Sequence, residues 1–252
     1  MKIENQTIII TGGASGMGAA TARELAKQGA KIALFDLNQT AAQKIATEIN
    51  GEAYTCDVTQ EASIQNALAE VQKKQGIARI IINCAGIVYG RRLINKEGPI
   101  PLADFKKVID VNLLGTFNVM RLAVHAMSTL PLIDEERGVI INTASIAAFD
   151  GQIGQCAYSA SKGGIVSLTL PAARDLSSLA IRVMTIAPGL VETPMLGEIS
   201  AETRAALAAS VPHPKRLVKP EEFASLVNHI IQNAMLNGEV IRLDGALRMA
   251  PK

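Results

Sequence analysis

Short apolar runs alternate along the chain with longer stretches in which apolar positions recur every three or four residues. The short runs are rich in Ile and Val and apolar almost throughout, which is typical of strands buried on both faces. The longer stretches have the spacing of amphipathic helices. Predicted strands cover residues 7–11, 31–35, 53–56, 79–83, 138–142, 181–186 and 239–243. Predicted helices cover residues 16–28, 39–49, 61–74, 102–130, 158–176, 198–209 and 220–232.

This alternation predicts an α/β fold of the Rossmann type, a doubly wound parallel sheet with helices on both faces. The chain shows no repeat, no low-complexity tract and no linker, so we expect one domain over residues 1–252. Two segments, 87–101 and 190–219, are rich in Gly, Pro and charge. We expect them to form loops or mobile helices beside a site.

Composition narrows the class of protein further. Hydrophobic residues make up 48% and charged residues 19% of the 252 residues, as in an ordinary globular chain. A net charge of +2 gives no reason to expect nucleic acid or an acidic membrane as a partner. No stretch approaches the ~20 apolar residues that a membrane span needs. The first residues run directly into a strand pattern without a leader-like segment, so we expect a cytoplasmic protein.

The three cysteines, Cys56, Cys84 and Cys156, lie far apart and form no C-x-x-C pair. We expect buried free thiols rather than a disulfide or ligands of a metal ion. No bound metal is predicted.

A glycine-rich turn lies between the first predicted strand and the first predicted helix. Gly12, Gly16 and Gly18 follow the pattern T-G-x-x-x-G-x-G, with Ser15 and Met17 between them. Such a turn lets the backbone approach a pyrophosphate closely and points a helix N-terminus at its negative charge. The position favours a dinucleotide site, although a purely structural turn is the alternative.

Polar and small residues follow the next strands at the same edge of the sheet. Asp36 ends the second strand, where a carboxylate can bind the adenosine ribose hydroxyls and repel a 2′-phosphate. No Arg or Lys follows it closely, so NAD is favoured over NADP; a helix-capping role is the alternative. Asp57 and Val58 follow the third strand, where an adenine would lie. Residues 83–86, Asn-Cys-Ala-Gly, allow close approach of a cofactor or form a plain turn.

Tyr158 and Lys162 are four residues apart on a predicted helix and therefore share one face. An ammonium near a phenol favours the phenolate and lowers its pKa, so the pair is suited to moving a proton on or off an alcohol oxygen. Ser145 follows a strand and can bind a substrate oxygen, or it is a cap or turn residue. Asn112 lies within a predicted helix. Its side chain either opens that helix to a water next to Lys162 or is solvated or bonded back to the helix.

Together these residues resemble the short-chain dehydrogenase/reductase family over essentially the whole chain. The resemblance implies that Tyr158 is the general acid/base and that Lys162 lowers its pKa and holds the nicotinamide ribose. It also implies that Ser145 positions the substrate oxygen, that Asn112 orders a proton-relay water, and that Thr193 binds the nicotinamide carboxamide. The remaining cofactor-binding residues that it implies are Cys84, Ala85, Gly86, Pro188, Gly189 and Val191. Cys84 departs from the family, since many members have Asn there.

Residues 137–145, 157–166, 186–190 and 236–246 resemble most a subfamily that oxidises (3S)-3-hydroxyacyl-CoA to 3-oxoacyl-CoA reversibly with NAD. This implies a role in fatty-acid or branched-chain amino-acid breakdown. It also implies a homotetramer paired through the helices near 102–130 and 158–176. The alternatives are an NAD-dependent dehydrogenase of another secondary alcohol, such as a steroid or polyol, a 3-ketoacyl carrier-protein reductase, and a dinucleotide sensor without catalysis.

The substrate residues are less firmly indicated by the sequence. Arg91 and Arg92 lie in a basic insertion at 90–99 and are candidates for the CoA phosphates, because Arg is a usual phosphate partner. A solvated loop is the alternative. Gln155, like Gln152, lies between Ser145 and Tyr158 and either lines the acyl pocket or belongs to a structural loop.

Overall fold

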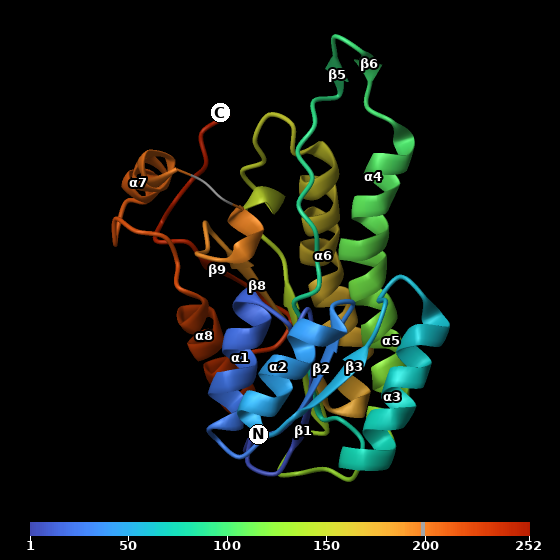
Figure 1. Ribbon diagram of the computed structural model, residues 1–252. Coiled ribbons are helices and arrows are strands. Elements are labelled where there is room, and N and C mark those ends of the chain that lie inside the picture. Colours follow the sequence, from blue (N-terminus) through green and yellow to red (C-terminus); the bar gives the residue numbers. More distant parts are fainter. Residues whose placement is uncertain (198–199) are drawn as a thin grey trace.

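The computed structural model describes residues 1–197 and 200–252 (Figure 1). Within these residues, seven strands form one sheet in which all neighbours are parallel, in the order β3-β2-β1-β4-β7-β8-β9. The strands are β1 (Thr7–Thr11), β2 (Lys31–Asp36), β3 (Glu52–Thr55), β4 (Ile80–Asn83), β7 (Gly138–Thr143), β8 (Ile181–Pro188) and β9 (Val240–Leu243). The strand order reverses at β1, between β2 and β4. The predicted Rossmann-type doubly wound fold is therefore confirmed.

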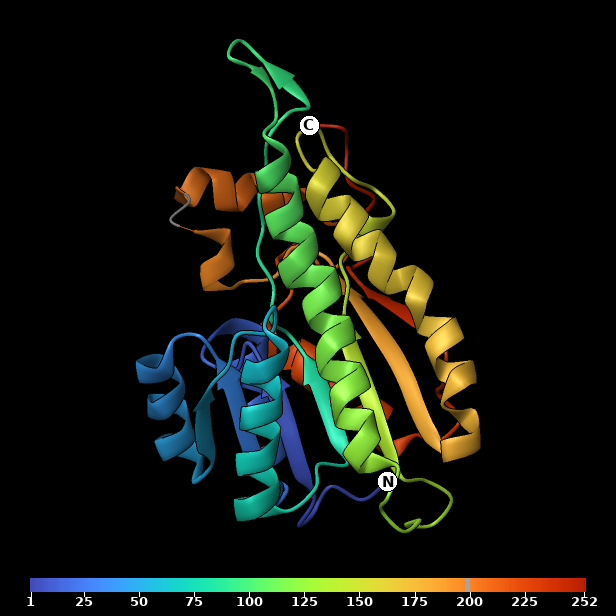
Figure 2. The same ribbon diagram turned by 90° about the vertical axis from the view of Figure 1, so that its right-hand side faces the viewer.

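Helices cover both faces of the sheet (Figures 1 and 2). The helices are α1 (Gly16–Ala26), α2 (Gln39–Ile49), α3 (Glu61–Gln75), α4 (Leu102–Ile109), α5 (Gly115–Met127), α6 (Cys156–Asp175), α7 (Ala201–Ser210) and α8 (Pro220–Gln232). Helices α1, α2 and α8 share one apolar core with the sheet, and α3, α5 and α6 share the other. Figure 2 shows α4 and α5 end to end (green) along the second face, with α6 (yellow) beside them.

The apolar strands explain why the sheet is covered on both sides. In β1, Ile8 and Ile10 belong to the core under α1 and α8, whereas Ile9 between them belongs to the core under α3 and α5. All three are fully buried. Burial of each isoleucine contributes about 2 kcal/mol, so neither face of this strand can be left to solvent.

The predicted helix over 102–130 is interrupted in the structure. A π-helical turn, η1 (Asp110–Leu114), separates α4 from α5. The turn contains Asn112, whose side chain hydrogen-bonds the backbone of Ile87 instead of facing solvent. The wider turn thus brings a polar side chain to the end of β4, as π-turns often do at functional sites.

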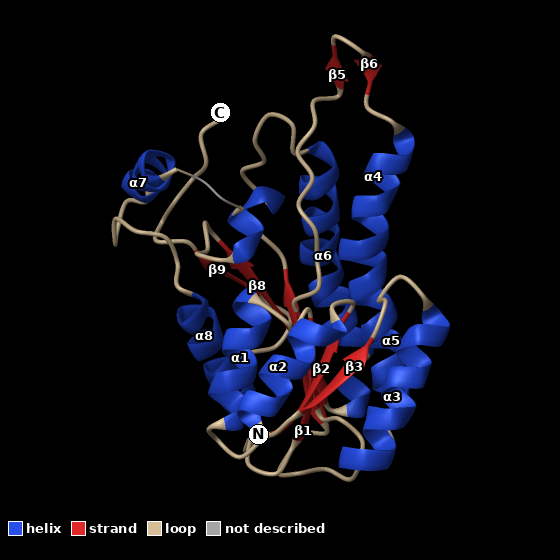
Figure 3. Cartoon of the chain, viewed as in Figure 1, coloured by secondary structure: helices blue, strands red, loops and turns tan. Residues whose placement is uncertain are grey.

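The basic insertion, predicted as a loop, contains a two-stranded antiparallel hairpin of β5 (Ile94–Asn95) and β6 (Gly98–Pro99). The hairpin projects beyond α4 (Figure 3). The predicted start of the helix at 198–209 falls on residues outside those described, and α7 begins at Ala201. Three short 3₁₀ turns complete the elements, η2 (Ile146–Ala148), η3 (Ser177–Leu179) and η4 (Pro194–Leu196).

Of the cysteines, Cys56 is buried, Cys84 half-buried and Cys156 exposed. The prediction of a buried thiol is wrong for Cys156. This residue is the first of α6, and its side chain is exposed. Across residues 1–197 and 200–252, no helix is long and apolar enough to cross a membrane.

Candidate active site

Two adjoining cavities lie at the carboxyl edge of the sheet, where α/β folds of this type bind ligands. The cofactor cleft, of about 270 Å³, follows the glycine turn toward Asp36. The substrate cavity, of about 310 Å³, lies over Ser145 and Tyr158. The two cavities share the lining residues Met17, Cys84, Gly86, Ile87 and Thr193.

The glycine turn forms a cradle that only glycine fits. Gly12 has a φ of +65°, and a Cβ there would lie 2.8 Å from the backbone nitrogen of Ala85. A Cβ on Gly18 would overlap the carbonyl oxygen of Gly12. Gly12, Gly16 and Gly18 also line the cofactor cleft, so bare backbone and the N-terminus of α1 face the space where a pyrophosphate would lie, which supports a dinucleotide site over a purely structural turn.

Asp36 lies at the far end of the cofactor cleft. Its carboxylate accepts hydrogen bonds from the backbone N–H of Ala14, at 3.0 Å, and of Asn38, at 2.9 Å. Asn38, not Asp36, caps α2 through the N–H of Ala41. These bonds orient the carboxylate, and each oxygen keeps a lone pair for a ribose hydroxyl.

Every residue predicted to bind the cofactor lines one of the two cavities. Those in the cofactor cleft are Gly12, Ser15, Gly16, Met17, Gly18, Asp36, Asp57, Val58, Cys84, Ala85, Gly86 and Thr193. Those in the substrate cavity include Tyr158, Lys162, Pro188, Gly189 and Val191. Thr193 packs on the glycine turn, since a Cβ on Gly16 would lie 3.2 Å from its methyl carbon. The set thus forms one continuous surface from Asp36 to the substrate cavity.

Ser145, Tyr158 and Lys162 line the same cavity. Ser145 is the N-cap of the η2 turn, and its Oγ accepts a hydrogen bond from the N–H of Ala147 at 3.1 Å. It therefore also has the capping role that was its alternative. The Nζ of Lys162 donates to the carbonyl oxygen of Thr143 at 2.7 Å and lies 5.8 Å from the centre of the Tyr158 ring. This arrangement places a hydroxyl, a phenol and an ammonium around one small volume.

Burial has the largest effect on the acid–base properties of this group. It raises the pKa of Tyr158 above the usual value, which the nearby Ser145 hydroxyl only partly offsets. Burial lowers the pKa of Lys162 to about 8. The expected lowering of the Tyr158 pKa by Lys162 is thus not seen in this structure: burial raises the pKa, and the lowering contribution comes from the Ser145 hydroxyl.

Asn112 is fully buried and connects two parts of the site. Its amide nitrogen donates to the carbonyl oxygen of Ile87 and to Ser161 Oγ, while its oxygen accepts from the Ile87 N–H. Ser161 Oγ in turn donates to the carbonyl oxygen of Tyr158. The solvated alternative for Asn112 is wrong. Its side chain joins the loop after β4 to α6 at Ser161.

The residues predicted to bind substrate are arranged less uniformly. Gln155 lines the substrate cavity, and its Oε1 accepts from the Gln152 N–H at 3.0 Å. Arg91 and Arg92 line neither cavity. Arg91 pairs with Glu97 at 3.0 Å and with Asp104 at 3.3 Å, so its charge is already balanced.

Several lining residues were not predicted from the sequence. In the cofactor cleft they are Phe35, Leu37, Cys56, Ile87, Val111 and Pro194, and in the substrate cavity Val88, Ile146, Ala147, Leu190, Leu196 and Met249. Many directly follow predicted residues at strand ends, which is a usable signal. The sequence around Met249 carries no such signal.

In the described part of the chain, no group of His, Cys, Asp and Glu is arranged to hold a metal ion.

The fold and the site define the class of protein, and comparison with known proteins agrees. Residues 6–204 match the model of the short-chain dehydrogenase family, and the chain belongs to that family.

Among its relatives is 3-hydroxyacyl-CoA dehydrogenase type-2 of Homo sapiens, 51% identical over 99% of this chain and 97% of that protein. The crystal structure of 3-hydroxyacyl-CoA dehydrogenase type-2 from Mycobacterium avium covers 98% of this chain and 97% of its own, with a TM-score of 0.93 and 41% identity. The 3-ketoacyl-(acyl-carrier-protein) reductase from Brucella melitensis, complexed with NADH, matches 98% of this chain and 100% of its own, with a TM-score of 0.89 and 30% identity.

Proposed function

We propose that this protein is an NAD-dependent 3-hydroxyacyl-CoA dehydrogenase, which oxidises a (3S)-3-hydroxyacyl-CoA to the 3-oxoacyl-CoA reversibly. The observation that carries the proposal is the position of Ser145, Tyr158 and Lys162 where an apolar cavity meets a glycine-lined cleft. Proteins named 3-hydroxyacyl-CoA dehydrogenase type-2 are 50% and 51% identical to this chain over 99% of its length, and this similarity supports the acyl-CoA substrate.

In this proposal, Tyr158 accepts the proton of the C3 hydroxyl during oxidation and returns it during reduction. Ser145 donates its O–H to the substrate oxygen, because the Ala147 N–H already occupies one of its acceptor sites. The ammonium of Lys162, fixed by the Thr143 carbonyl oxygen, faces the Tyr158 ring and stabilises the phenolate once it forms. Asn112 is a positioning residue that holds the backbone of Tyr158 through Ser161.

Bound NAD would supply the acceptor for the hydride that leaves the C3 carbon. The residues that would hold it follow the cofactor cleft. Asp36 would bind the adenosine ribose, Asp57 and Val58 would lie at the adenine, and the glycine turn would bind the pyrophosphate. At the nicotinamide end, Lys162 would bind the ribose, and Thr193 the carboxamide.

A substrate panel tests the proposal directly. NADH formation or consumption would be measured with acetoacetyl-CoA, a branched 3-hydroxyacyl-CoA, a 3-ketoacyl carrier protein and free secondary alcohols, each with NAD(H) and NADP(H). We expect the highest kcat/KM for the CoA thioesters with NAD(H). Activity confined to free alcohols would replace this proposal with that of another secondary-alcohol dehydrogenase.

For the CoA phosphates, the ion pairs of Arg91 make Arg92 the better candidate. Arg92 is exposed and, among the described residues, forms no ion pair within 4 Å. We expect Arg92→Ala to raise KM for acetoacetyl-CoA several-fold while leaving KM for a short N-acetylcysteamine thioester unchanged. Equal effects on both substrates would argue against a phosphate contact.

We also propose a cytoplasmic homotetramer paired through the long helices. Three large apolar side chains on these helices are about half exposed, with 50% for Leu114, 48% for Phe117 and 44% for Leu170. A second copy of the chain would cover them. Light scattering after size exclusion would measure the oligomer, and cell fractionation its location.

A further inference from the structure

The wall of the substrate cavity includes a segment that is distant in sequence from every catalytic candidate. Residues 247–252, here named the C-terminal tail, follow β9. In this tail, Met249 lines the cavity together with Ser145 and Tyr158. Leu247 is buried against Ile146, the residue after Ser145, and Met249 packs on the same cluster. The tail therefore lies against the turn that carries the Ser145 hydroxyl.

The tail backbone is hydrogen-bonded to the loop between this turn and α6. Gln152 Nε2 donates to the carbonyl oxygen of Ala250 at 2.9 Å, and the N–H of Ile153 donates to that of Pro251 at 3.0 Å. Gln152 itself lines the cavity. The tail is thus fixed along the edge of the cavity at consecutive residues.

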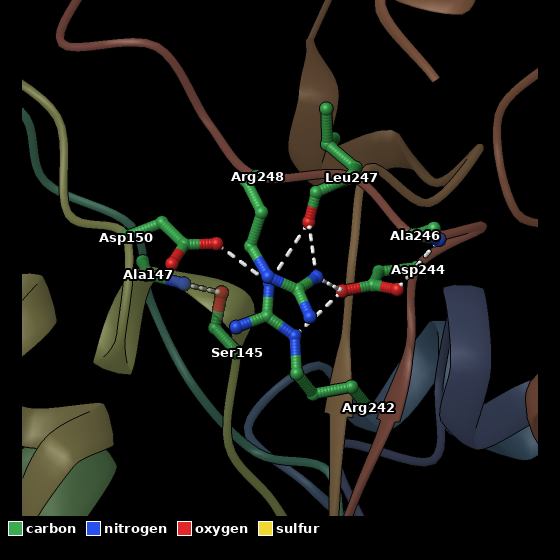
Figure 4. Close-up of polar contacts among 8 residues, drawn as sticks. All are labelled: Ser145, Ala147, Asp150, Arg242, Asp244, Ala246, Leu247 and Arg248. Atoms are coloured by element: carbon green, nitrogen blue, oxygen red, sulfur yellow. Dashed lines mark hydrogen bonds and ion pairs between the residues drawn. The ribbon is translucent and has the colours of Figure 1, made fainter. Parts of the chain in front are cut away.

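Arg242, in β9, links the tail to the segment that follows Ser145 through hydrogen bonds to both (Figure 4). Its guanidinium donates to Asp150, two residues after η2, at 2.6 Å and to the carbonyl oxygen of Leu247 at 2.9 Å. It also donates to the buried Asp244 at 2.7 Å and lies 5.1 Å from the centre of the Phe149 ring. A planar group with several N–H donors can hold these partners at once, whereas a lysine cannot.

Arg248 adds a second link from the tail. It donates to the carboxylate of Asp244 at 3.2 Å, so two guanidinium groups share one buried carboxylate. Figure 4 shows the side chains of Arg242 and Arg248 meeting between Asp150 and Asp244. The cluster is built from two segments that are about 90 residues apart in sequence, and its bonds decide where the tail lies.

We propose that the C-terminal tail is the wall that limits the acyl chain, that Met249 sets the chain length accepted, and that Arg242 is the positioning residue that holds this wall. The inference rests on the proposed acyl-CoA function. The surrounding lining is apolar, with Ile146, Ala147 and Leu190 beside Met249. A thioether side chain is flexible and apolar, so it suits contact with an alkyl chain of variable shape.

Met249→Ala and Met249→Phe test the wall. The measurement is the ratio of kcat/KM for 3-oxodecanoyl-CoA to that for acetoacetyl-CoA. We expect Met249→Ala to raise this ratio at least about tenfold, because room for even one further methylene in an apolar pocket changes specificity by about that factor, and Met249→Phe to lower it. Met235→Ala is the matched control, since Met235 is 90% exposed. A ratio that is the same in the wild type and both Met249 variants would overturn the proposal.

Arg242→Gln tests the positioning role. It is expected to bring the chain-length ratio toward that of Met249→Ala, with Arg242→Lys giving an intermediate value. Arg23→Gln, which breaks an exposed pair with Glu48, controls for the loss of an ion pair. A lower melting temperature with an unchanged ratio would show that Arg242 is only structural and would overturn its assigned role.

Failure of the proposed function would be recognised separately. If the wild type turned over no acyl thioester, the same variants would be compared on 2-octanone and 2-butanone with NADH. The ratio for these ketones is expected to shift in the same directions. An unshifted ratio would overturn the wall inference whichever substrate is used.

Discussion

The cofactor cleft and the substrate cavity meet at Cys84 and Gly86, yet they are built in different ways. Most of the cofactor cleft comes from short segments at the ends of β1, β2, β3 and β4, and its lining includes the glycines Gly12, Gly16, Gly18 and Gly86. The substrate cavity combines the ends of β7 and β8 with the start of α6 and the C-terminal tail. Gly86 and Gly189 are the glycines in its lining, and the other lining residues carry side chains, among them Leu190 and Met249.

This difference assigns cofactor binding to one region and substrate selectivity to the other. A cradle of backbone and glycine fits a part of a ligand that does not vary, such as a pyrophosphate, and tolerates no added side chain. A wall of side chains such as Leu190 and Met249 can change in size without a change of fold. Changes in the cofactor cleft should therefore affect folding and cofactor binding, whereas changes in the substrate cavity should affect turnover and substrate choice.

The largest effect is expected for Tyr158→Phe, which should abolish most of the turnover and leave the cofactor cleft intact. Tyr158→Phe removes the hydroxyl proposed to transfer the proton, and kcat should fall by about 10²–10⁴-fold, while the Kd for NADH changes little. Steady-state rates and NADH fluorescence titration measure the two quantities. Tyr54→Phe is the matched control, because the buried Tyr54 hydroxyl has no hydrogen-bond partner among the described residues. Wild-type turnover in Tyr158→Phe would refute the mechanism.

Gly12→Ala is expected to disrupt the glycine turn of the cofactor cleft. The new Cβ meets the backbone of Ala85 at a φ of +65°, so the free energy of unfolding should fall by about 2–4 kcal/mol, and NADH binding should be lost. Gly76→Ala is the control, since Gly76 has a φ of +91° but nothing within 4 Å of a Cβ. It should cost only the backbone strain, about 1–2 kcal/mol. Equal losses in both variants, by denaturant titration, would show that the cradle is not tightly packed.

The same contrast explains how much the sequence predicted. The glycine turn, Asp36 and the Tyr158–Lys162 pair each lie within one short segment, and all of them line one of the two cavities. The π-turn at Asn112 was not predicted, because its reason is a hydrogen bond to the loop of Ile87, 25 residues away. Met249 was missed for the same physical reason: its place in the cavity depends on tertiary contacts of the tail. The raised pKa of Tyr158 also follows from burial, which spacing along a helix does not reveal.

The pH dependence of stability sharpens the view of the substrate cavity. The folded chain loses the Lys162 proton near pH 8, whereas the unfolded chain holds it to about 10.5. Between these values the unfolded state binds more protons, so the wild type gains stability as the pH rises. The pKa difference corresponds to about 3 kcal/mol. The free energy of unfolding of the wild type should therefore rise by about that amount relative to that of Lys162→Met between pH 8 and 10.5. Parallel curves would mean that Lys162 is not desolvated.

The smallest expected effect concerns cofactor choice. Asp36 accepts N–H groups from both Ala14 and Asn38, and an Asn at this position would present an NH₂ group to one of them. Asp36→Asn should therefore weaken the proposed contact with the ribose and remove the repulsion of a 2′-phosphate. The preference for NAD over NADP, measured as a ratio of kcat/KM values, should fall about tenfold, the effect of roughly 1.4 kcal/mol.

Asn38→Ala is the control for this last change, because it removes the cap of α2, at a cost of about 1 kcal/mol, without touching the carboxylate. If it lowered the NAD preference as much as Asp36→Asn does, local loosening of the helix start would explain both variants. A change in cofactor preference confined to Asp36→Asn, with acyl-chain preference unaltered, would show that the two regions can be tuned separately. That independence is expected because Asp36 lines only the cofactor cleft and Met249 lines only the substrate cavity.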